Sequence, residues 1–162
     1  AADELQREHP RARREVEIRQ EGRGAHLLAL RHRIVSIKQC EDSAGLMVDP
    51  LLLKGIYYSD IKQYNTALAL FEECIKRDWK FIEAYIEKGI VLFDQKKYTN
   101  ALEVFKLGAT VSNTNADTYY WLGRCYEELK DKEQAKENYG RALSLDRDLV
   151  EAEDGIERLK KN

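Results

Sequence analysis

A 34-residue repeat in the C-terminal two thirds of the chain is the feature that most limits how this sequence can fold. Gly55, Gly89 and Gly123 are each 34 residues apart. Three further columns keep the same register: Ala67, Ala101 and Ala135; Phe71, Phe105 and Tyr139; and Leu51, Tyr85 and Tyr119. Agreement of four columns argues against coincidence. A period of this length is typical of a two-helix unit that cannot bury its apolar face alone and stacks on its neighbours.

Each unit is predicted to consist of two helices joined by a short turn. In the first unit, apolar residues recur at helical spacing in residues 51–59 and again in residues 64–77. The glycine and alanine columns indicate a close approach of the two helices, with the aromatic column beside them. Apolar runs stay far shorter than the ~20 residues of a membrane-spanning helix. The sequence therefore predicts an all-α fold, an α-solenoid of antiparallel helix pairs, without membrane insertion.

These columns resemble the tetratricopeptide repeat family. The resemblance implies three repeats, at residues 48–81, 82–115 and 116–149, wound into a right-handed superhelix. It also implies a capping helix within residues 150–162, because such arrays commonly end in an extra helix that covers the last repeat.

The resemblance further implies a binding groove, because the first helix of each pair lines the concave face in this family. The groove positions, found by their offset from the glycine column, are Leu52, Ile56, Glu83, Ile86, Ile90, Phe93, Asp117, Tyr120, Arg124 and Glu127. Their floor is apolar and their border is acidic. Such a border favours partners that carry Lys or Arg beside apolar anchors. The alternative is that these apolar residues only pack against adjacent helices.

One use of this fold can be compared position by position. Family members that hold the acidic C-terminal tails of cytosolic chaperones resemble one another in a clamp of Lys, Asn, Asn, Lys and Arg. The corresponding residues here are Leu52, Ile56, Glu87, Asp117 and Trp121. None matches and two are acidic, so we expect no binding of such tails at this clamp.

Residues 1–47 form a leader that differs from the repeats in composition. They contain no aromatic residue and carry a net charge of +1, against −3 for residues 48–162. Within the leader, the apolar spacing of residues 25–39 predicts a helix whose other faces are basic. Three interpretations stay open for it: a cap on the first repeat, an occupant of the groove in the same chain or a second copy, or a flexible leader derived partly from another sequence.

No arrangement of residues indicates catalysis, a cofactor or a metal. His26 and His32 are six residues apart and fall on different faces of a helix, and the three cysteines include no CxxC pair. A net charge of −2 gives no support to nucleic-acid binding. The leading hypothesis is a non-enzymatic module that docks a peptide or helix. The alternative is an assembly subunit that self-associates through its termini, including residues 25–39, or its convex face. Free cysteines and the lack of a secretory segment favour the cytoplasm.

Overall fold

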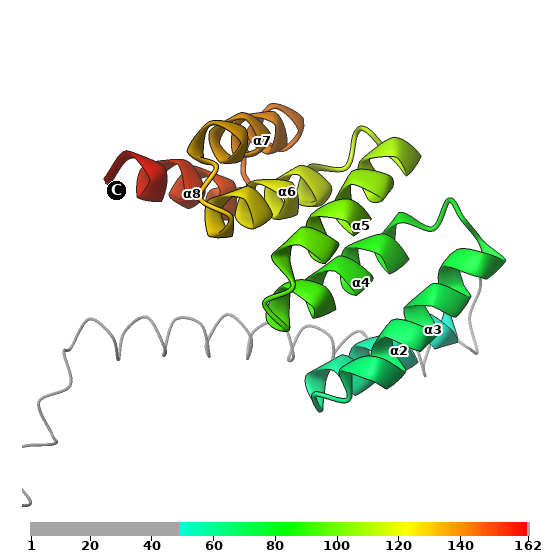
Figure 1. The fold of residues 1–162 in the computed structure, drawn as a ribbon. Helices are drawn as coiled ribbons and strands as arrows, with labels where there is room; N and C mark the ends of the chain where they lie inside the picture. The colour runs from blue at the N-terminus through cyan, green and yellow to red at the C-terminus, as the bar shows by residue number, and fades with distance from the viewer. Residues whose placement is uncertain (1–48, 162) are drawn as a thin grey trace, which may run out of the picture. The chain divides into compact units, whose positions relative to one another are not determined.

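The computed structural model describes residues 49–161, and all of their regular secondary structure is helical. The helices are α2 (Pro50–Asp60), α3 (Tyr64–Arg77), α4 (Ile82–Asp94), α5 (Tyr98–Val111), α6 (Ala116–Glu128), α7 (Lys132–Leu145) and α8 (Val150–Lys161). They form antiparallel pairs that stack one on the next (Figure 1). The predicted all-α solenoid is confirmed for this part of the chain.

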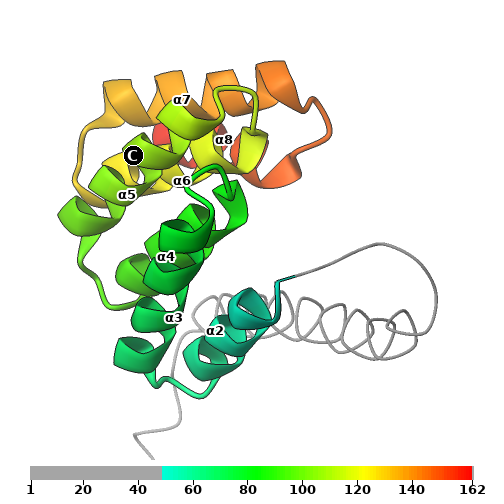
Figure 2. The same cartoon turned by 90° about the vertical axis from the view of Figure 1, so that its right-hand side faces the viewer.

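Packing follows the order of the helices along the chain. Each helix contacts the next one, and the first helices of neighbouring pairs also touch, α2 with α4 and α4 with α6. Helix α8 packs against both α6 and α7. The view in Figure 2, turned by 90°, shows the same succession of pairs from α2 to α8. The first helices therefore share one side of the stack, where the candidate site lies.

The glycine and aromatic columns meet inside each pair. A Cβ atom built on Gly123 would lie 2.6 Å from the ring of Tyr139, which is closer than real Cβ contacts. The corresponding glycines of the first two pairs, Gly55 and Gly89, press equally closely against Phe71 and Phe105. All three rings are fully buried. The glycine and aromatic columns thus mark the positions at which the first helix of each pair contacts an aromatic ring of the second helix.

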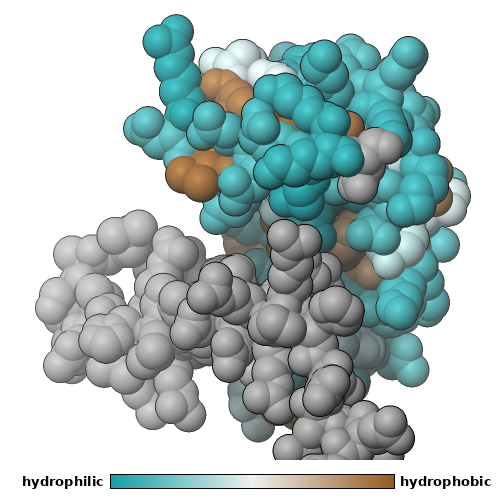
Figure 3. Space-filling view, turned by 90° about the vertical axis from the view of Figure 1, so that its left-hand side faces the viewer, coloured by the Kyte–Doolittle hydropathy of each residue, from teal (hydrophilic) through white to brown (hydrophobic). Residues whose placement is uncertain are grey.

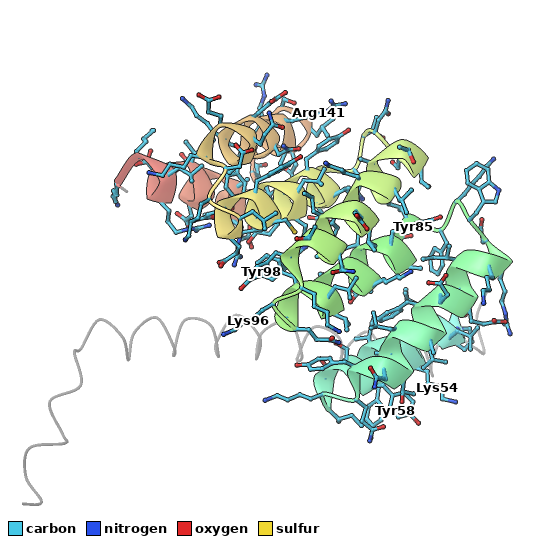
Figure 4. The ribbon with its side chains drawn as sticks, in the orientation of Figure 1. Lys54, Tyr58, Tyr85, Lys96, Tyr98 and Arg141 are labelled. Carbon is cyan, nitrogen blue, oxygen red and sulfur yellow. The ribbon has the colours of Figure 1, made fainter. Side chains whose placement is uncertain are left out.

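A second periodic feature, a lysine with a positive φ angle, follows the end of the first helix of each pair. Lys62, Lys96 and Lys130 have φ angles of 61°, 61° and 67°, in the left-handed region. After α4, the Lys96 N–H donates to the Phe93 carbonyl and the next N–H donates to the Leu92 carbonyl. This pair of hydrogen bonds is a Schellman motif. Figure 4 shows Lys96 at the turn that leads from α4 into α5.

The ends of the described region have their own stabilising contacts. At the start, the Asp49 carboxylate accepts a hydrogen bond of 2.8 Å from the Leu51 N–H and caps α2, with Pro50 as the first helical residue. Helix α8 lies in the range where a capping helix was expected, and buries Ala152 and Gly155. The hypotheses on residues 1–47, including the helix at 25–39, lie outside the described residues.

Candidate functional site

On α2, the first helix of the stack, the two groove positions differ in how much surface they offer. Leu52 is only 6% exposed and packs in a core cluster with Ala84 and Val91 of α4. Ile56 is half-buried against the same cluster. Leu52 therefore joins α2 to α4, and Ile56 is the apolar side chain of α2 that keeps part of its surface.

Helix α4 contributes both apolar and acidic groups. Ile86, Ile90 and Phe93 are half-buried, and Glu83 in the first turn is exposed. Ile90 and Phe93 also pack against the larger core cluster. These residues keep exposed surface while they contribute to the packing between helices, so the two interpretations of the apolar floor overlap.

Helix α6 carries an arginine surrounded by aromatic rings. The Arg124 guanidinium lies 5.2 Å from the ring centroid of Phe93 and 5.8 Å from that of Trp121. It donates a hydrogen bond of 3.0 Å to the Tyr120 hydroxyl. Burial disfavours the charged guanidinium, but the interaction with Tyr120 outweighs this and raises the pKa of Arg124. Cation–π contacts hold Arg124, the single basic residue among the predicted groove positions, against aromatic rings of α4 and α6.

The two acidic groove residues of α6, Glu127 and Asp117, differ in their surroundings. Glu127 accepts hydrogen bonds from Arg158 of α8, at 3.0 Å from each of two guanidinium nitrogens, and one of 2.5 Å from the Tyr139 hydroxyl. Burial acts to raise the pKa of Glu127, but these hydrogen bonds lower it on balance. Its charge is therefore matched within the fold, and it adds little to an acidic border.

Asp117 lies at the opposite end of α6, near the turn between α7 and α8. Its side chain is exposed as a whole. Partial burial of the carboxyl group, with the charges of Asp146 and Glu151, nevertheless raises its pKa. The three carboxylates form an acidic cluster at the end of the groove.

Glu87 of α4 corresponds to a position of the clamp and does not belong to the predicted groove set. Its side chain is half-buried. Burial of the carboxyl group, followed by the charge of Asp60 on α2, raises the pKa of Glu87 to about 7. Its place two residues before Gly89 marks it as a groove position, but burial of the carboxyl group is visible only in the structure.

The described region offers no sign of reactive or metal chemistry. Residues 49–161 contain no group of three or more His, Cys, Asp or Glu side chains that could hold a metal ion. Cys74 and Cys125 are buried free thiols, and burial raises the pKa of Cys125 to about 12, so it stays protonated. Within the same residues, no helix combines the length and apolar character needed to cross a membrane.

Comparison with known proteins identifies the repeat. The sequence model of the family described as Tetratricopeptide repeat matches residues 48–78 and 116–149. These ranges contain the helix pairs α2–α3 and α6–α7. The chain carries tetratricopeptide repeats. A comparison with curated protein sequences gives no significant match.

Solved structures with tetratricopeptide repeats share the fold. The first such domain of Spaghetti (RPAP3), bound to the HSP90 peptide SRMEEVD, has a TM-score of 0.65 at 22% identity, covering 72% of this chain and 97% of that one. The Arabidopsis OM64 domain has a TM-score of 0.65 at 22% identity, covering 68% and 92%. The Sgt2 domain of Aspergillus fumigatus has a TM-score of 0.65 at 18% identity, covering 68% and 75%.

Proposed function

We propose that the chain is a non-enzymatic protein-interaction module that docks a peptide or helix with apolar and basic residues. The docking surface is the groove along α2, α4 and α6. The observation that carries this proposal is the combination of half-buried apolar residues with carboxylates that have no cationic partner in residues 49–161, Glu83 and Asp117 among them. A surface of this kind gains free energy when an apolar side chain covers it, and the carboxylates attract a basic partner.

The same charges argue against an acidic ligand. The peptide bound to the Spaghetti (RPAP3) domain, SRMEEVD, contains three acidic residues. In this chain, two positions of the carboxylate clamp are Glu87 and Asp117, which repel such a peptide. We expect the groove to select the opposite charge.

The test begins with a displayed library of random short peptides, selected on the full chain. Binding of an enriched peptide is then measured by calorimetry on the wild type and on Ile90→Asp. The matched control is Leu107→Asp, since Leu107 is 56% exposed on α5, the second helix of its pair. Ile90→Asp should weaken binding by about tenfold or more, whereas the control stays near wild type.

Since Ile90 also packs against the core, the melting temperature of each variant is measured alongside. Ile86→Ser, at a neighbouring half-buried position, provides a milder change of the same surface. Failure to enrich any peptide, or equal affinity in the wild type and both groove variants, contradicts the proposed function.

Self-association is the second candidate, and exposed apolar side chains outside the groove favour it. Tyr57 is 59% exposed and Val150 is 60% exposed, at the two ends of the described stack. The face seen from the side of α8, by contrast, is mainly hydrophilic, with apolar side chains in small separate patches (Figure 3). Light scattering of the full chain over a range of concentrations tests this candidate, including self-association through residues 25–39. A constant monomer mass contradicts it.

A further inference from the structure

Glu87 shares a face of α4 with two of the predicted groove residues. Residues three and four apart lie on the same side of a helix, so Glu83, Glu87 and Ile90 share one face. The buried residues Tyr85 and Gly89 lie on a different face, where Gly89 rests on a ring of α5. Glu87 is thus on the groove side of α4 and is not part of the contact between α4 and α5.

The Glu87 carboxyl group differs from that of Glu127, the other partly buried carboxylate of the site, because it has no charged partner. Glu127 is paired with Arg158, and the neighbouring Lys88 pairs with Glu72 of α3. Among residues 49–161, no side chain forms a hydrogen bond or ion pair with Glu87, and the charge that acts on it is the like charge of Asp60. Desolvating a carboxylate without a partner costs free energy. A cation from outside this part of the chain would offset the free energy lost on desolvating the Glu87 carboxylate.

Asp60 strengthens the preference for a cation. It is the last residue of α2, where the helix dipole places partial negative charge. Ile56 lies one helical turn earlier on the same side of α2, and Ile90 lies one turn after Glu87 on α4. Each of the two carboxylates therefore has an apolar isoleucine one turn away on its own helix.

We propose that Glu87, with the negative charge of Asp60 beside it, forms a subsite for a lysine or arginine side chain of the docked segment, with Ile56 and Ile90 receiving an adjacent apolar side chain. This inference rests on the proposed function and specifies its partner. The partner is a protein segment that presents a basic residue beside an apolar one. Charge complementarity is the argument for this occupant, because the carboxyl group of Glu87 has the like charge of Asp60 beside it and no cationic partner among residues 49–161.

The experiment compares the peptides selected by the wild type with those selected by Glu87→Gln. The wild type should enrich peptides that share a Lys or Arg next to an apolar residue, and Glu87→Gln should lose that preference. Glu103→Gln is the matched control, because Glu103 is exposed on α5 and its substitution changes the net charge equally. For one enriched peptide, Glu87→Gln should weaken binding about tenfold, with Glu103→Gln near wild type.

A double-mutant cycle assigns the contact to the two charges. Replacing the basic residue of the peptide by glutamine should weaken binding to the wild type and cause little further loss on Glu87→Gln. Enriched peptides that lack a basic residue, or that bind Glu87→Gln as tightly as wild type, overturn the subsite but leave groove docking in place. An unproductive selection overturns the docking function itself. Dimerisation of the full chain that Glu87→Gln abolishes assigns the subsite to a second copy and overturns the choice of partner.

Discussion

At the scale of single residues, the glycine column is required by the rings it touches and not by its backbone conformation. Gly89 lies inside helix α4, where glycine costs up to about 1 kcal/mol relative to alanine. The ring of Phe105 occupies the space that a Cβ atom would need. The contact with the ring therefore outweighs the helix preference.

This balance gives a prediction with an internal control. Gly89→Ala should lower the free energy of unfolding by about 1–3 kcal/mol, because the added methyl group forces the buried ring of Phe105 to move. Gly140→Ala should raise it by about 0.5–1 kcal/mol, because nothing lies within 4 Å of the new Cβ atom on α7. Urea unfolding of both variants measures the difference. Equal stabilisation by the two substitutions would show that the ring contact is not limiting.

The buried carboxyl group of Glu87 makes stability depend on pH. Its pKa is raised from 4.5 to about 7 in the folded state, so between these values the folded protein binds more protons than the unfolded chain. Stability from this group is present at low pH and is lost as the pH rises through about 7. Glu87→Gln should therefore raise the free energy of unfolding by about 1–3 kcal/mol at pH 8 and change it little at pH 4, below the ordinary pKa of 4.5. Thermal melts at both pH values test this, and an equal gain at the two contradicts the burial of the charge.

Residue types alone could not separate Glu87 from Glu127. Both are glutamates at groove-side positions in the sequence, but Glu127 meets Arg158, which lies 31 residues further along the chain. The predicted acidic border treated all carboxylates as equal, since sequence spacing shows the face of a helix and not its distant partners. The structure leaves Glu87 as the buried carboxylate without a matching charge from residues 49–161.

At the scale of elements, a lysine in a backbone conformation that suits glycine lies two residues after the end of each first helix. Lys96 adopts φ 61° to complete the Schellman motif after α4, and the same occurs at Lys62 and Lys130. Side chains with a Cβ atom are disfavoured there, and glycine is the usual residue at this position. Each turn therefore stores a small amount of strain.

Relieving this strain should stabilise the pair. Lys96→Gly is expected to raise the free energy of unfolding by about 0.5–1 kcal/mol, because glycine adopts the left-handed conformation without a steric cost. Lys136→Gly is the control, since Lys136 is exposed inside helix α7, where glycine lowers stability by about 1 kcal/mol. Chemical denaturation of the two variants gives the comparison. A loss of stability in Lys96→Gly would mean that the lysine side chain contributes more than its backbone costs.

The helix pairs could be predicted from the sequence because packing imposes its own period on the residues in contact. Gly, Ala and aromatic residues recur every 34 positions where helices touch. The turn at residues 61–63 falls in the gap between the stretches predicted to be helical, 51–59 and 64–77, but the lysine column gives no sequence signal for the Schellman motif. Lysine has no special preference for positive φ, so its recurrence did not indicate a turn.

At the scale of the whole molecule, the last repeat depends on α8. The ring of Tyr139 lies between Gly123 of α6 and Gly155 of α8, and hydrogen bonds join its hydroxyl to Glu127 and Glu127 to Arg158. In a stack, each unit is stabilised mainly by its neighbours, so contacts at one end act first on the adjacent repeat. Arg158 thus links the terminal helix to the first helix of the third repeat.

Breaking this link should loosen the end of the stack before the rest. Arg158→Gln removes both hydrogen bonds that the guanidinium donates to the half-buried Glu127, and we expect a loss of about 1–2 kcal/mol. Because Arg158 helps to lower the pKa of Glu127, its contribution is present above the unfolded pKa and is lost on acidification. Hydrogen exchange at pH 7 should show faster opening in α6 to α8 and little change in α2 to α4. The exposed Arg147, changed to glutamine, is the control; uniform acceleration through all helices in Arg158→Gln would mean that the stack unfolds as one cooperative unit.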